Sequence, residues 1–114
     1  MQRPSLNSTE VAALTAVLAY WEGRWDWECP LLFGLELPEY RVALAQWRVT
    51  SDAVSLPQVA LAMNGALREF LYGASAVKAE AVAAIAGMPK SDLVALAHRI
   101  GPFVLAVVER RRTA

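Results

Sequence analysis

The chain has 114 residues, of which 56% are apolar, and its 11 acidic residues are balanced by 11 basic ones. This length fits one domain with one core, residues 1–114, and the single cysteine, Cys29, excludes an internal disulfide framework and gives no support to a thiolate metal site. We expect no signal peptide, because the first residues lack an apolar segment, and no membrane span, because the most apolar tract, 93–108, is short and interrupted at Arg99 and Pro102. An unbonded cysteine fits a reducing compartment, so we expect a cytoplasmic protein.

Two helices are predicted in the first half of the chain. Asn7 and Glu10 have the spacing of a capping box, in which each side chain bonds the other residue's backbone N–H. Apolar residues then recur at helical spacing and predict a helix over Ser8–Glu22. An irregular stretch, 24–37, follows with room for one helical turn, and a second helix begins near Pro38, a residue favoured in first turns.

Three further helices are predicted in the second half. Ser55 and Gln58 have the spacing of another capping box and begin a helix that closes at Gly73. A short helix is predicted over about 76–86. The apolar stripe of the last helix keeps its phase through Gly101-Pro102, which favours one kinked helix over two separate ones. We therefore expect an all-α bundle of about five helices.

The sequence carries no recognisable catalytic set. His98 is the only histidine and has no carboxylate three or four residues away, although acid–base catalysis and metal binding both need a partner within reach. Cys29 has no neighbouring base that would activate its thiol. We also find no glycine-rich phosphate loop and no catalytic motif. We therefore predict a non-enzymatic protein without a cofactor or a metal.

A helix-turn-helix is the second possibility, over residues 82–100. Ala83, Gly87 and Leu93 have roughly the spacing of such a motif: a small residue, a turn glycine and an apolar anchor. The recognition helix would be largely apolar, however, and Asp92 would repel phosphate. A plain helical hairpin is the favoured interpretation, and nucleic acid is not the expected partner. A small DNA-binding regulator remains the alternative.

The aromatic residues of the first half suggest a binding surface. All four tryptophans lie between Trp21 and Trp47, and no single helix face can bury Trp21, Trp25 and Trp27 together. Helical phase assigns Trp21 and Trp47 to the core and leaves Trp25 and Trp27 as interface candidates. Exposed tryptophans framed by charge are typical of binding hot spots.

Acidic residues surround these tryptophans. Residues 1–57 hold seven acids and four bases, a net charge of −3, whereas residues 58–114 hold four acids and seven bases, a net charge of +3. A balanced chain has no general electrostatic attraction to nucleic acid, although a local basic patch such as Arg110–Arg112 could supply one. The acidic residues that we assign to a partner-binding surface, beside Trp25 and Trp27, are Glu22, Asp26, Glu28 and Glu36.

The segment from Tyr20 to Trp47, YWEGRWDWECPLLFGLELPEYRVALAQW, resembles segments of small orphan bacterial proteins, some of which are similar to immunity proteins that neutralise a cognate toxin. Residues 64–71, NGALREFL, add to this resemblance. The resemblance implies a small cytoplasmic bacterial protein that occludes a protein partner through acidic side chains. It carries over no catalytic or binding signature.

These observations together predict a protein-binding module, most specifically an immunity-like inhibitor of a protein partner such as a toxin. The apolar fraction exceeds the usual range of about 45–50%, so self-association is a further possibility. In that alternative a homo-oligomeric structural module would dimerise through a second apolar face of the last helix, formed by Val94, Phe103 and Leu105.

Overall fold

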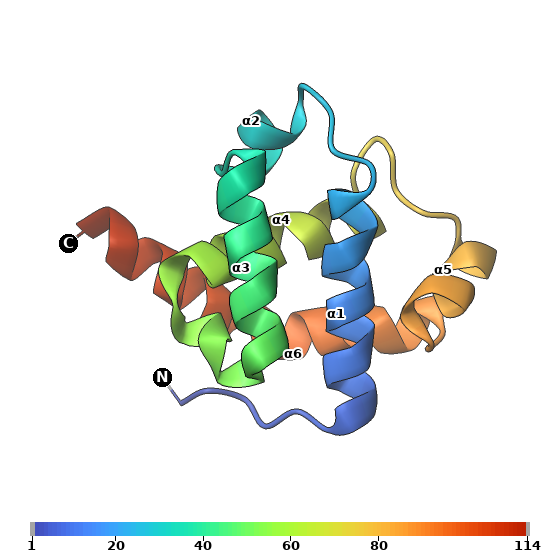
Figure 1. Cartoon of the computed structure of the whole chain (residues 1–114). Coiled ribbons are helices and arrows are strands. Elements are labelled where there is room, and N and C mark those ends of the chain that lie inside the picture. Colours follow the sequence, from blue (N-terminus) through green and yellow to red (C-terminus); the bar gives the residue numbers. More distant parts are fainter. Residues whose placement is uncertain (1, 114) are drawn as a thin grey trace.

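The structure is a computed structural model that describes residues 2–113, with side chains described through residue 111. The described residues form helices, with no strand among them. Figure 1 shows α1 and α3 upright in front of α4 and α6, with α2 above them and α5 at the side. The elements are α1 (Ser8–Glu22), α2 (Cys29–Phe33), α3 (Leu37–Val49), the 3₁₀ turn η1 (Ser51–Ser55), α4 (Pro57–Leu71), α5 (Ala79–Ala86) and α6 (Lys90–Thr113). The predicted all-α bundle is therefore confirmed.

The start of α1 is fixed by the predicted capping box. The Asn7 side chain accepts a hydrogen bond from the Glu10 backbone N–H at 2.8 Å, and the Glu10 carboxylate accepts one from the Asn7 backbone N–H at 2.9 Å. Two N–H groups that have no partner within the helix are thus satisfied by local side chains. The observed bounds, Ser8–Glu22, are those predicted.

Two other predicted helix starts were wrong. Ser55 does not cap α4: its hydroxyl donates to the Asp52 carbonyl at 2.9 Å and so belongs to η1, and the capping position falls on Leu56. α5 begins at Ala79, three residues later than expected. Val77 lies two residues before this helix and outside it. Its backbone N–H donates to the carbonyl of Phe70, near the end of α4.

The core joins α1, α3, α4 and α6 around large buried aromatic side chains. Trp21 and Trp47 are 7% and 2% exposed, which confirms their predicted place in the core. Their ring N–H groups have partners at 3.0 Å and 2.8 Å, the Ala66 carbonyl and the Thr15 hydroxyl. A buried indole N–H without a partner would be destabilising, so these bonds fix each ring in one orientation.

The last helix runs unbroken through Gly101 and Pro102. In Figure 1 it changes direction between its orange and red parts. A proline within a helix is an expected cause of such a bend, because it lacks the N–H of a helix hydrogen bond. By length and composition alone, its segment Lys90–Arg111 could cross a membrane; this segment is longer than the tract 93–108 that we considered too short. Seven of its apolar side chains, however, belong to the core: Leu93, Leu96, Ile100, Phe103, Val104, Val107 and Val108.

The N-terminus of α1 is also tied to α6, and this contact predicts a pH dependence of stability. The pKa of the Glu10 carboxyl is lowered, first by the hydrogen bond from the Asn7 backbone and then by Arg99, whose guanidinium lies 2.6 Å away. A carboxyl with a lowered pKa in the folded state stabilises the fold above its ordinary pKa, and this contribution disappears as the pH falls through the lowered value.

We therefore expect Glu10→Gln to lower the free energy of unfolding by about 0.5 kcal/mol at neutral pH, a typical value for a surface ion pair. The difference between the two proteins should vanish in strong acid. Urea unfolding of both proteins across the acidic range measures it, and a difference that is independent of pH would contradict this assignment.

Candidate functional site

The site is organised by α2, a single helical turn that sits on the core. Pro30 lies in its first turn, where a missing N–H costs nothing, and Gly34 ends it in the left-handed conformation with φ +73°. Phe33 points inward and is 3% exposed. Its ring contacts those of Trp21, Trp25 and Tyr40, with centroids 5.2–5.8 Å apart. One buried aromatic residue thus anchors the whole turn.

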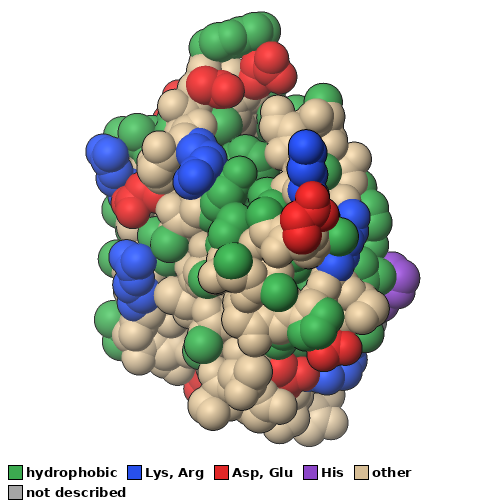
Figure 2. All heavy atoms as spheres, turned by 90° about the vertical axis from the view of Figure 1, so that its right-hand side faces the viewer, with side chains coloured by type: hydrophobic (Ala, Val, Ile, Leu, Met, Phe, Trp, Pro, Cys, Tyr) green, Lys and Arg blue, Asp and Glu red, His purple; other side chains and the backbone are tan. Residues whose placement is uncertain are grey.

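Two exposed apolar side chains lie at this end of the molecule, one just before α2 and one on its outer face. Trp27 is 78% exposed and Leu31, four residues later, is 80% exposed. Asp26 and Glu28 flank the tryptophan and are exposed as well. We call these four residues, Asp26, Trp27, Glu28 and Leu31, the apex surface. Figure 2 shows hydrophobic side chains with acidic ones beside them at the end of the molecule that carries α2.

The predicted acidic residues do not all contribute equally to this surface. The Glu22 carboxylate lies 3.5 Å from the Arg41 guanidinium, which balances its charge. The Asp26 carboxylate accepts the Glu28 backbone N–H at 2.9 Å and thereby shapes the turn. Glu28 and Glu36 are exposed. Residues 22–41 hold five acids and two bases, so this end of the molecule carries a net charge of −3.

The structure separates the two tryptophans that we had grouped together. Trp25 is half-buried and lies over Phe33 and Tyr40, with ring centroids 5.2 Å and 4.8 Å away. It supports the apex surface from below, whereas Trp27 projects from it. The prediction that one ring of the group reaches solvent is confirmed, and that ring is Trp27.

Two titratable groups beneath the apex are held in their neutral forms. Burial raises the pKa of the Cys29 thiol, and the Asp26 carboxylate adds to this effect. Burial also raises the pKa of the Tyr40 phenol, whose O–H donates to the Leu18 carbonyl at 2.6 Å. A protonated, 2% exposed thiol is a poor nucleophile, so Cys29 acts in packing.

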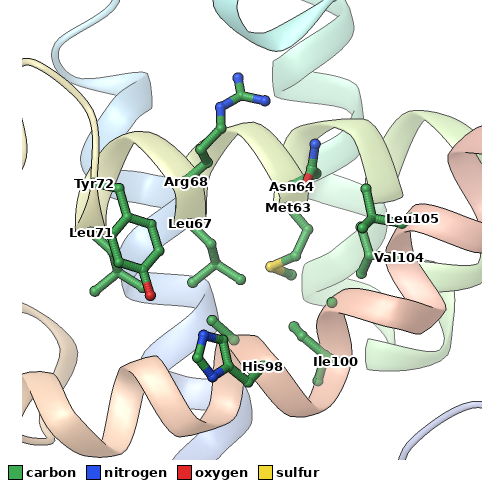
Figure 3. Close-up of a pocket in the computed structure, with 12 residues that line it drawn as sticks. Met63, Asn64, Leu67, Arg68, Leu71, Tyr72, His98, Ile100, Val104 and Leu105 are labelled. Carbon is green, nitrogen blue, oxygen red and sulfur yellow. The ribbon is translucent and has the colours of Figure 1, made fainter.

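A cavity of about 290 Å³ lies between α4 and α6, and sequence analysis did not find it. Its floor consists of core side chains, among them Met63 and Ile100, while Tyr72 and His98 stand at one end (Figure 3). Its two walls come from segments at least 25 positions apart in the chain. Only the exposed apolar residues of the two helices, such as Leu105, could have hinted at it.

The region proposed for a helix-turn-helix has part of the required geometry. Gly87 ends α5 in the left-handed conformation with φ +76°, and α6 begins at Lys90. The outer face is not that of a DNA reader, because Asp92 is exposed and the Arg99 guanidinium is bound to Glu10. No basic side chain lies within α5, Ala79–Ala86. Of the basic tail, Arg110 and Arg111 are described, whereas the side chain of Arg112 lies outside the described part.

The three residues proposed for a dimerisation face do not form one exposed surface. Phe103 is 6% exposed and belongs to the core, and Val94 packs against the core. Only Leu105 is exposed, to 50%. Phe103 follows Leu93, Leu96 and Ile100 at helical spacing, so it lies on the buried face of α6 and not on a second face.

No protein-family model, curated protein or solved structure matches the chain. Among the described residues, no group of three His, Cys, Asp or Glu side chains is arranged to hold a metal ion.

Proposed function

We propose that this chain is a non-enzymatic protein-binding module that uses its apex surface, and that it acts in a cytoplasmic compartment. The observation that carries the proposal is the exposure of Trp27 on a rigid turn. A tryptophan exposed to 78% leaves a large apolar surface in water, and its burial against a partner would be favourable.

The support beneath Trp27 strengthens this interpretation. The turn is anchored by Phe33 and Trp25, so little conformational freedom is lost when a partner binds. The acidic side chains around the apolar patch would select a basic partner and guide its approach. A small protein that covers a basic surface with an acidic patch is an immunity-like inhibitor, and this is our more specific proposal. A DNA-binding role has less support, since the outer face near Gly87 is not basic.

The test is co-purification from the native host, with a tagged wild-type chain and two matched variants. Trp27→Arg places a positive charge at the centre of the apex surface. Val49→Arg makes the same kind of change at another apolar residue, 85% exposed, at the far end of α3. Circular dichroism establishes that both variants are folded.

We expect one basic protein to be recovered with wild type and with Val49→Arg, more strongly at low salt than at high salt. Trp27→Arg should weaken its binding about 30-fold, the effect of a hot-spot residue that contributes about 2 kcal/mol. Equal recovery by all three proteins, or recovery of none, would refute the assignment of the apex surface.

A further inference from the structure

The cavity between α4 and α6 is the second feature that calls for an explanation, and it lies apart from the apex surface. Its walls are apolar and belong to the core itself: Met63 and Leu67 from α4 and Ile100 and Val104 from α6 are all at most 6% exposed. Protein interiors are normally filled to the density of organic crystals. An apolar hollow that reaches the core is therefore a place where an apolar group can be buried.

Gly101 helps to leave the cavity open. A Cβ atom added there would meet no other atom within 4 Å, so close packing does not require a glycine at this position. Gly65 is different, because a Cβ there would lie 3.0 Å from the Phe33 ring. A larger side chain at position 101 can therefore enter the cavity without a collision, and such a substitution can be used to test whether the cavity binds a ligand.

Two polar side chains, Tyr72 and His98, lie at one end of the cavity, whereas the amide of Asn64 lies away from them. Figure 3 shows the Tyr72 hydroxyl and the His98 imidazole turned toward each other there. Both can donate a hydrogen bond. The guanidinium of Arg68 is turned away, because it donates to the Leu32 carbonyl and pairs with Glu69 at 3.0 Å. Arg68 thus contributes its aliphatic stem.

The lining of the cavity is not acidic, unlike the apex surface. No Asp or Glu is among the described residues that line the cavity, and its ionisable groups are Arg68, His98 and the phenol of Tyr72. An anion at the Tyr72–His98 end would therefore find two donors and no repelling carboxylate. A cation there would find neither an acceptor of opposite charge nor a favourable field.

We propose that this cavity binds a small amphipathic carboxylic acid. The apolar body lies against Met63, Ile100 and Val104, and the carboxylate accepts hydrogen bonds from Tyr72 and His98. The volume is just below the range of about 300–1,000 Å³ that holds drug-sized molecules, which limits the body to a short alkyl chain or a single ring. The occupant is a free metabolite-sized acid and not a protein segment.

The experiment uses three probes with the same apolar chain and different heads: octanoate, 1-octanol and octylamine. Each is titrated into the isotope-labelled full chain, and backbone amide shifts are followed by NMR. We expect octanoate to shift amides of α4 and α6 around the cavity and to bind at least tenfold more tightly than octylamine, with octanol between them.

Variants locate the two parts of the ligand. Tyr72→Phe and His98→Ala change exposed side chains and should each weaken octanoate about tenfold, as expected for the loss of a hydrogen bond to a charged group. Gly101→Leu should abolish binding by filling the cavity, whereas Gly101→Ala should retain it. Trp27→Arg should leave octanoate binding unchanged, which separates this proposal from the proposed function.

Three results would overturn the proposal. Equal binding of octylamine and octanoate would remove the case for an acid. Shifts that map outside the cavity, or that persist in folded Gly101→Leu, would place the ligand elsewhere. An absence of shifts with octanoate at millimolar concentration would refute binding of this ligand class.

Discussion

Phe33→Ala is expected to lower the free energy of unfolding by about 3–5 kcal/mol, the usual cost of removing a buried phenyl ring. The ring is 3% exposed and is shared by Trp21, Trp25 and Tyr40, so its removal leaves a cavity at the point where α2 meets the core. The free energy of unfolding of a domain of this size is only about 5–15 kcal/mol, so this single substitution removes a large part of the stability.

Urea unfolding followed by circular dichroism measures the effect. Leu31→Ala is the matched control, because it shortens an apolar side chain of the same helix at a position that is 80% exposed. We expect it to change the stability by less than about 0.5 kcal/mol. Similar losses for the two variants would mean that α2 is not anchored by Phe33, and the rigid support that we infer for Trp27 would fall with it.

Local hydrogen bonding explains which helix boundaries could be predicted from the sequence. Asn7 and Glu10 satisfy each other's backbone N–H groups, so their spacing alone predicted the correct start of α1. Ser55 has the same kind of spacing to Gln58 but has a local alternative, the Asp52 carbonyl. Hydroxyl groups bond equally well to turns and to helix ends, and the sequence does not say which bond forms.

In the candidate site, too, the features set by local helix geometry could be predicted from the sequence, whereas those set by contacts between distant segments could not. Helical phase placed Trp21 and Trp47 in the core correctly, because both lie within regular helices. It could not separate Trp25 from Trp27, since α1 ends at Glu22 and the phase is lost beyond it. The α4–α6 cavity could not be predicted from the sequence, because it depends on how the two helices cross.

The close approach of α2 to α4 gives the second strong prediction. Gly65 lies within α4, where glycine is unfavourable by about 1 kcal/mol relative to alanine. A Cβ at this position would lie 3.0 Å from the Phe33 ring and 3.2 Å from its Cα, which explains the glycine. Gly65→Val must push α2 outward, and we expect it to lower the free energy of unfolding by about 2–3 kcal/mol, a typical cost of overpacking.

A double-mutant cycle tests this cause directly. In the Phe33→Ala protein the ring is gone, and the valine side chain can enter part of the space that it leaves. We therefore expect Gly65→Val to cost less than half as much in that background, a coupling of at least about 1 kcal/mol between the two positions. If the double variant is too unstable to measure, Gly65→Ala replaces Gly65→Val in the cycle, because its Cβ alone would already meet the Phe33 ring.

Additive losses in this cycle would show that valine harms α4 for a reason of its own, such as its lower helix propensity, and that Phe33 is not the obstacle. A coupling would show instead that α2 is held at a fixed distance from α4 by one ring and one missing side chain. That distance fixes the position of α2, and Trp27 lies only two residues before this helix in the chain. The expected coupling thus connects a buried contact to the surface through which we propose that this protein binds its partner.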